Sequence, residues 1–132
     1  MRAAIPFNQR IFREFRLFVV PVLLENRGRS LYISMIFDSG ASYVSVRPDV
    51  FDQLEISPLR DVPLVTASQH VRSVLGQVDK VTVGAHFSAE KIDIIPVPFP
   101  ENLPAEGLLG TSFLRHFPLM MDFDKGILEL IS

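Results

Sequence analysis

Short apolar runs separated by turn-forming residues recur along most of this chain and limit the folds it can adopt. Such runs lie at 16–24, 30–37, 62–67, 73–83 and 91–98, with a final pair at 119–123 and 127–131. The segments ENRG (25–28) and DKG (124–126) between them are typical of hairpin turns. Long helical periodicity is absent, which argues against a doubly wound α/β fold. The pattern predicts a compact, mostly-β single domain.

Three local features refine this prediction. The stretches 47–54 and 111–117 are expected to be short helices. Pro48 stands where a helix accepts proline in its first turn, and Thr111 or Ser112 is available as the N-cap of the second helix. Pro21 has no amide proton for a sheet ladder, so the run 16–24 is expected at a sheet edge.

The composition is that of an ordinary globular chain of 132 residues, with 48% apolar residues and a formal net charge of -2. One hydrophobic core fits this length, and no nucleic-acid partner is expected. Arginines gather near the start, where residues 1–15 are interpreted as an N-terminal basic arm before a domain at 16–132. The absence of cysteine excludes disulfides, thiolate nucleophiles and Cys-ligated metals. Without a recognisable signal peptide or membrane-spanning run, a cytoplasmic protein with no membrane partner is expected.

Most familiar catalytic motifs are missing from the sequence. There is no G-x-S-x-G, P-loop, G-x-G-x-x-G or H-E-x-x-H segment. The three histidines are far apart and lack metal-ligand spacing, so neither a metal nor another cofactor is expected. A serine hydrolase would need Ser39 or Ser112 to meet a histidine without any motif in support. Asp38 stands out instead, because it ends an apolar run where an unpartnered carboxylate is costly to bury.

Asp38 belongs to the segment FDSGAS (37–42), and a second segment, GLLGTSFLRHF (107–117), places two leucines before Gly110. Together they resemble the retropepsin-like aspartic proteases, single-lobe relatives of pepsin, in particular their bacterial members. The resemblance covers roughly residues 16–131. It implies an all-β, closed β-barrel with one or two short helices, assembled as a two-fold homodimer. It also implies an aspartic endopeptidase that acts on a peptide or protein substrate.

The resemblance implies roles for individual residues. Asp38 is expected to act as general acid or base, and the single Asp-Ser-Gly means that a second copy of the chain supplies the second carboxylate. The Ser39 hydroxyl is expected to tie the two active-site loops together. The other expected site residues are the loop supports Ser39, Gly40, Ala41 and Ser42, the loop behind the site at Leu108, Leu109 and Gly110, and a flap tip at Ser68, Gln69 and His70.

The chain also departs from the family's pattern. Family flaps usually carry glycine near the tip, and TASQHVRS (66–73) has none. Retroviral members often have an Asp–Arg ion pair where this chain has Ser42 and Thr111. The C-terminal ILELIS is short for an interleaved dimer sheet, so residues 1–15 are an alternative source of interface. Two alternatives to a protease remain open: a catalytically silent dimeric peptide-binding module on the same fold, and a structural domain whose Asp-Ser-Gly is only a turn.

Overall fold

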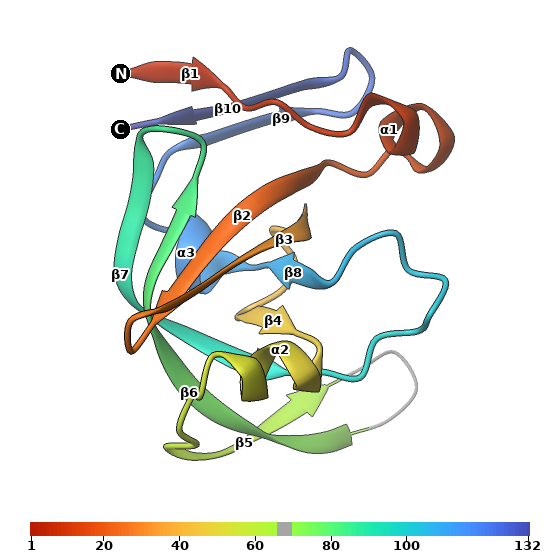
Figure 1. Ribbon diagram of the computed structural model, residues 1–132. Coiled ribbons are helices and arrows are strands. Elements are labelled where there is room, and N and C mark those ends of the chain that lie inside the picture. Colours follow the sequence, from red (N-terminus) through yellow and green to blue (C-terminus); the bar gives the residue numbers. More distant parts are fainter. Residues whose placement is uncertain (66–69) are drawn as a thin grey trace.

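The computed structural model describes residues 1–65 and 70–132, which form strands and three short helices (Figure 1). In chain order the elements are β1 (Arg2–Ala4), α1 (Gln9–Phe15), β2 (Val19–Asn26), β3 (Arg29–Phe37), β4 (Val44–Val46), α2 (Pro48–Gln53), β5 (Arg60–Val65), β6 (His70–Val83), β7 (Phe87–Pro96), β8 (Gly107–Leu109), α3 (Thr111–Leu114), β9 (Leu119–Asp122) and β10 (Ile127–Ile131). The predicted all-β class with short helices is therefore confirmed.

A closed barrel forms the larger part of the molecule. Its strands follow the order β2–β3–β8–β4–β7–β6, and the barrel closes because β6 also pairs with β2. Strand β5 pairs with the first part of β6, and β1, β10 and β9 form a separate three-stranded sheet. Figure 1 shows this small sheet at one end of the molecule, where both termini lie. One core joins the two sheets, since Met35 and Ile94 of the barrel belong to the same buried cluster as Leu130 of β10.

The β2–β3 hairpin sets the register of the strand that leads to Asp38. Asn26 pairs with Arg29, which leaves Arg27 and Gly28 as a two-residue loop with φ angles of 51° and 78°. Positive φ at both positions is typical of a type I′ turn, whose twist matches that of the two strands. Near its end β3 is buried on both faces, since Met35 joins the main core and Ile36 joins a second cluster. This double burial explains the unbroken apolar run before Asp38.

The prediction of an edge position for the run 16–24 is wrong from Val22 onward, where β2 has a paired strand on both sides, whereas Pro21 itself lies where β2 has one neighbour. The strand pairs with β3 along its whole length and with β6 from Val22 to Glu25. Pro21 lies one residue before this second pairing and is exposed. Proline therefore occupies the part of β2 that has a paired strand on one side, where a missing amide donor is tolerated.

Residues 1–15 contain two elements that the sequence did not lead us to predict. Strand β1 pairs with β10 along its whole length. Helix α1 begins after Asn8, whose side chain accepts the N–H of Ile11, and it ends at Arg16, which adopts a positive φ of 56°. The ring of Phe12 stacks on that of Phe18 with centroids 4.9 Å apart. These residues are packed against the barrel, and a domain boundary after residue 15 stays a prediction.

The two predicted helices are present and shorter than expected. Helix α2 begins at Pro48, in the position predicted for it. Helix α3 has Gly110 at its N-cap position, so the prediction of a Thr111 or Ser112 cap is wrong. Both hydroxyl groups bind elsewhere, as described below. Within the described residues, no helix has the length and apolar character needed to cross a membrane.

Candidate active site

Asp38 lies directly after β3, in the loop that joins β3 to β4, and we call residues 38–43 the Asp38 loop. The loop begins with a tight turn, because the N–H of Ala41 donates to the Asp38 carbonyl at 3.2 Å. The N–H of Gly40 donates to Oδ1 of Asp38 at 3.0 Å. Asp38 is half-buried, whereas Ser39 and Gly40 are exposed. A backbone amide thus holds one carboxylate oxygen while the residue keeps contact with solvent.

Strand β8 lies between β3 and β4, although β3 and β4 follow each other in the sequence. It runs parallel to β3, with Leu109 opposite Phe37, and antiparallel to β4, with Leu108 opposite Ser45. The N–H of Asp38 donates to the carbonyl of Leu109 at 3.1 Å. The structure therefore brings together the two segments that the sequence analysis singled out, and the Asp38 loop passes over the end of β8.

Gly110 lets the chain pass close behind the Asp38 loop. A Cβ atom at this position would come within 2.7 Å of the Ala41 carbonyl oxygen and 2.8 Å of the Tyr43 carbonyl carbon, and closer still to the Tyr43 oxygen. All three are backbone atoms, which cannot swing aside as a side chain can. Any residue with a Cβ would therefore push the loop away from this segment.

The first residues of α3 bind the far side of the Asp38 loop. The N–H of Thr111 donates to the Ala41 carbonyl at 2.8 Å, and that of Ser112 donates to the Ser42 carbonyl at 3.0 Å. The Thr111 hydroxyl also donates to the Ser42 carbonyl, at 3.2 Å. Ser42 and Thr111, whose side chains carry no charge for an ion pair, are thus neighbours joined by a neutral hydrogen bond.

The Ser112 hydroxyl has two backbone partners. Its Oγ accepts the N–H of Val44 at 2.8 Å and donates to the carbonyl of Asp93 in β7, also at 2.8 Å. Ser112 is buried, and both of its hydrogen-bonding functions are satisfied within the chain. The Ser112 hydroxyl is therefore not free to act as a nucleophile, and it does not support the serine-hydrolase alternative.

An apolar hollow of about 400 Å³ opens beside the Asp38 loop. Most of its walls come from apolar side chains of β5, β7 and the segment after β7, together with the loop itself. The lining residues are Ala41, Ser42, Tyr43, Ser45, Pro63, Leu64, Ile95, Val97, Phe99 and Leu108. Apart from Ala41, Ser42 and Leu108, the sequence analysis missed these residues. The sequence alone does not distinguish apolar residues that line a pocket from those of the core.

The hairpin expected to be a flap is described in part. Strands β5 and β6 pair as far as Val65 opposite His70. Ser68 and Gln69 lie outside the described residues, and His70 is described as the first residue of β6 but not in its side chain. Pro63 and Leu64 of β5 line the apolar hollow, so the described part of this hairpin borders the space next to the Asp38 loop.

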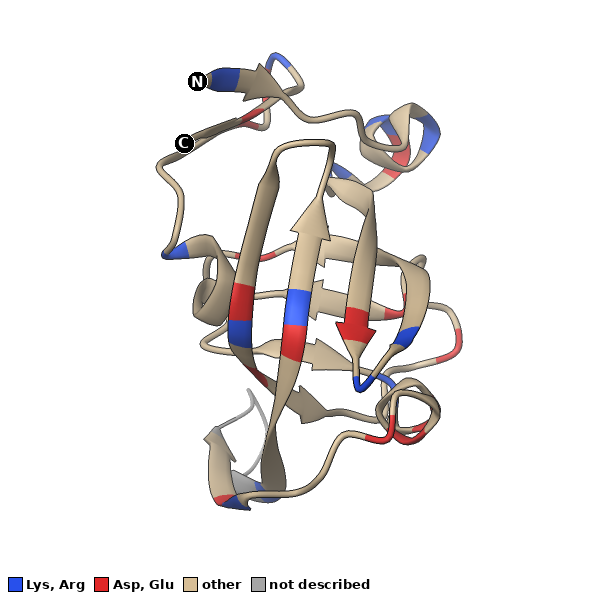
Figure 2. Cartoon of the chain, turned by 60° about the vertical axis from the view of Figure 1, so that its left-hand side comes forward, with Lys and Arg blue, Asp and Glu red and all other residues tan. Residues whose placement is uncertain are grey.

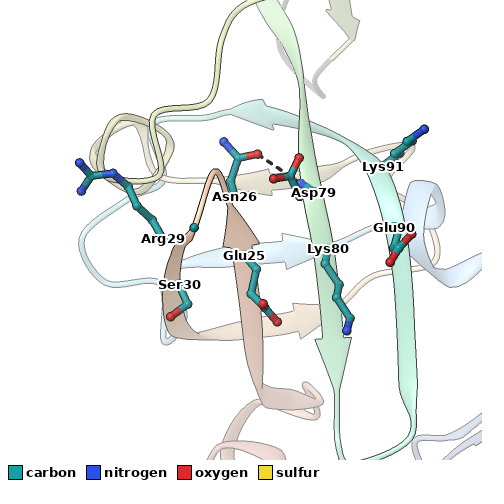
Figure 3. A pocket seen from close by; sticks show the side chains of 9 residues that line it. Glu25, Asn26, Arg29, Ser30, Asp79, Lys80, Glu90 and Lys91 are labelled. Atoms are coloured by element: carbon teal, nitrogen blue, oxygen red, sulfur yellow. Dashed lines mark hydrogen bonds between the residues drawn. The ribbon is translucent and has the colours of Figure 1, made fainter.

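A second hollow, of about 440 Å³, lies near the β2–β3 turn at the opposite end of β3 from Asp38. It adjoins a band of alternating charge across β2, β6 and β7, where Lys80 lies opposite both Glu25 and Glu90 (Figures 2 and 3). Figure 3 shows the Asn26 side chain bound to Asp79, whose N–H donates to Asn26 Oδ1 at 3.2 Å. Alternating charges opposite each other stabilise a solvent-facing sheet, and this accounts for the band without a ligand.

Metal-binding side chains do not gather in the described part of the chain. Within residues 1–65 and 70–132, no group of three or more His, Cys, Asp or Glu side chains is placed to hold a metal ion. His86 and His116 are both exposed, and they lie on β6–β7 and α3–β9 connections rather than at the Asp38 loop. Among residues 38–43, all of them described, Asp38 carries the one carboxyl group.

Comparisons with known proteins agree with this geometry. Residues 27–116, more than half of the chain, match the family described as "gag-polyprotein putative aspartyl protease". Among solved structures, the chain resembles the crystal structure of a retropepsin-like aspartic protease from Rickettsia conorii, with a TM-score of 0.67 and 19% sequence identity. The similarity covers 98% of this chain and 89% of that one, and at this identity it establishes the fold. No curated protein matches the sequence.

Proposed function

The chain belongs to this family of aspartyl proteases, and from this premise we propose that it is a homodimeric aspartic endopeptidase with Asp38 as its catalytic residue. The proposal depends above all on one observation: the half-buried Asp38 lies on a loop that donates a hydrogen bond to Leu109 and accepts hydrogen bonds from Thr111 and Ser112. A carboxylate held this firmly, yet in contact with solvent, suits a group that activates water.

The chemistry requires two carboxylates around one water molecule. The ionised carboxylate takes a proton from the water, and the protonated one donates a hydrogen bond to the carbonyl of the scissile peptide bond. The water oxygen attacks that carbonyl, and the proton passes on to the departing amide nitrogen. Each chain supplies one Asp-Ser-Gly, so two copies related by a two-fold axis supply the pair. We propose that Ser39, which is exposed beside Asp38, contacts the partner's loop.

The apolar hollow next to the Asp38 loop supports a peptide or protein substrate. A volume of about 400 Å³ accommodates a large apolar side chain. Its walls include Ala41 and Tyr43 of the Asp38 loop itself, so a side chain seated there belongs to a residue close to the scissile bond. We propose that the enzyme prefers a bulky apolar residue at this position.

The test combines Asp38→Asn with dilution of the wild-type protein. Asparagine keeps the shape of the carboxyl group but cannot accept the proton of the water, so we expect cleavage of an unstructured protein such as casein to fall by more than about 10³-fold. Light scattering should find the same dimer in the variant. In the wild type, activity per chain should fall on dilution with the midpoint of dimer dissociation. Full activity in Asp38→Asn, or in a stable monomer, would contradict the proposal.

A further inference from the structure

We propose that Ser112 is a positioning residue for Asp38: its hydroxyl group fixes the Asp38 loop against strand β7. The inference rests on the proposed function, because it assigns a role within the same site. Among the described residues, Ser112 is one of three buried polar residues, with Asn26 and Ser45. A buried hydroxyl costs free energy unless it is hydrogen-bonded, so the two hydrogen-bond partners of the Ser112 hydroxyl indicate its role.

Those partners come from two neighbouring strands. Strands β4 and β7 are parallel, with Val44 opposite Ile94. The N–H of Val44 and the carbonyl of Asp93 are the groups that a direct ladder bond of such a pair would join. The hydroxyl of Ser112 lies between them instead, at 2.8 Å from each. Ser112 is therefore inserted as a bridge in the sheet, at the residue where the Asp38 loop enters β4.

The backbone of Ser112 binds the same loop two residues earlier. Its N–H donates to the Ser42 carbonyl at 3.0 Å, so Ser112 contacts the loop at Ser42, the first residue of β4 at Val44, and β7 at Asp93. Because hydrogen bonds have narrow length ranges, the loop cannot move relative to β7 without losing one of the three. The other end of the loop is held by the bond from the Asp38 N–H to Leu109.

This double attachment is what makes Ser112 relevant to Asp38. Loss of the hydroxyl removes the link to β7 and leaves the Val44 N–H without its acceptor, while Asp38 itself is untouched. A misplacement of about 1 Å at a reacting group lowers the rate about 10²-fold. We therefore expect the turnover number to fall more than the binding of substrate, because most walls of the hollow lie outside the Asp38 loop, on β5, β7 and the segment after β7.

The experiment compares Ser112→Ala and Ser112→Thr with Asn26→Ala as a matched control. Asn26 is also buried and bridges two backbone groups, Leu54 carbonyl at 2.9 Å and Asp79 N–H at 3.2 Å, at the opposite end of the barrel. With each dimer folded, we expect Ser112→Ala to lower kcat about 10- to 100-fold with KM changed less than about threefold. Ser112→Thr, which keeps the hydroxyl, should recover most of the loss, and Asn26→Ala should stay within about twofold of the wild type.

A second measurement needs no activity. The amide of Gly40 binds Oδ1 of Asp38, so its NMR chemical shift should move in Ser112→Ala and stay in Asn26→Ala. The inference is overturned if Ser112→Ala and Asn26→Ala have equal kcat and the chemical shift of the Gly40 amide does not move. It is also overturned if Ser112→Thr is as slow as Ser112→Ala. If the wild type cleaves no peptide, the proposed function fails and the Gly40 shift alone decides the role of Ser112. If Ser112→Ala does not fold, Ser112→Cys, of similar size but with a weak hydrogen bond, replaces it.

Discussion

Replacing Gly110 with alanine tests how closely the chain must pass behind the Asp38 loop. The added Cβ would lie 2.7 Å from the Ala41 oxygen and nearer still to the Tyr43 oxygen, whereas ordinary contact begins near 3.4 Å. The Ala41 carbonyl must therefore move by about 0.7 Å, and that of Tyr43 by more. The hydrogen bonds from Thr111 and Ser112 to this loop, at 2.8 and 3.0 Å, would break or stretch.

The magnitude follows from these contacts. Each lost backbone hydrogen bond costs about 1 kcal/mol net, and overpacking against a fixed backbone costs about 1–3 kcal/mol. The lower entropy of the unfolded alanine variant offsets less than about 1 kcal/mol. We expect Gly110→Ala to lose about 3 kcal/mol of the free energy of unfolding. Because the displaced atoms belong to the Asp38 loop, kcat should also fall about 10²-fold.

Gly76→Ala is the control for this experiment. Its Cβ would meet the side chains of Ile56, at 2.5 Å, and of Phe51 in α2, at 3.0 Å, and neither residue belongs to the Asp38 loop. This variant should lose about 1–3 kcal/mol of stability while kcat of the folded enzyme stays within about twofold of the wild type. Urea unfolding followed by circular dichroism and peptide cleavage measure the two effects. A Gly110→Ala enzyme with normal stability and normal kcat would refute the reasoning.

Two further predictions concern the N-terminal segment and the apolar hollow. Phe12 is 5% exposed and stacks on Phe18, so Phe12→Ala should lower the free energy of unfolding by about 3–5 kcal/mol in urea titrations; an unchanged midpoint would mean that residues 1–15 are an independent arm. Phe99 lines the hollow, so Phe99→Ala should enlarge it and raise kcat/KM for the bulkiest apolar side chains about 10-fold relative to smaller ones. A peptide library measures this preference. An unchanged cleavage profile would mean that the hollow does not bind a substrate side chain.

The parts of the fold that the sequence predicted are those with local causes. The two-residue turn at Arg27 and Gly28 depends on their own φ angles, and the apolar run before Asp38 reflects the burial of β3 itself. Helix α1 was missed because seven residues supply little periodicity. The Asn8 cap and the four-residue spacing of Ile11 and Phe15 indicate a helix. The arginines around them led instead to the interpretation of a basic arm.

The site was predictable at Asp38 and less so around it. Asp38 was singled out by its place at the end of an apolar run, and the segment 107–110 through the family resemblance. Their contact arises from the pairing of β3 with β8, to which no local pattern points. Tyr43 is far in the sequence from Ile95 and Phe99, and each of the three resembles an ordinary core residue. The role of Ser112 was equally hidden, because a hydroxyl bridge between two strands depends on the placement of all three segments.

The insertion of β8 between β3 and β4 has a consequence for the order of events during synthesis. The pairing of Leu109 with Phe37 spans more than half of the chain, and such distant pairings form late because the intervening chain must first be ordered. On the ribosome, Asp38 emerges long before Leu109, and until then its amide has no carbonyl to bind. A growing chain therefore carries an incomplete site, and we expect proteolytic capacity to begin only when the last quarter of the polypeptide has docked.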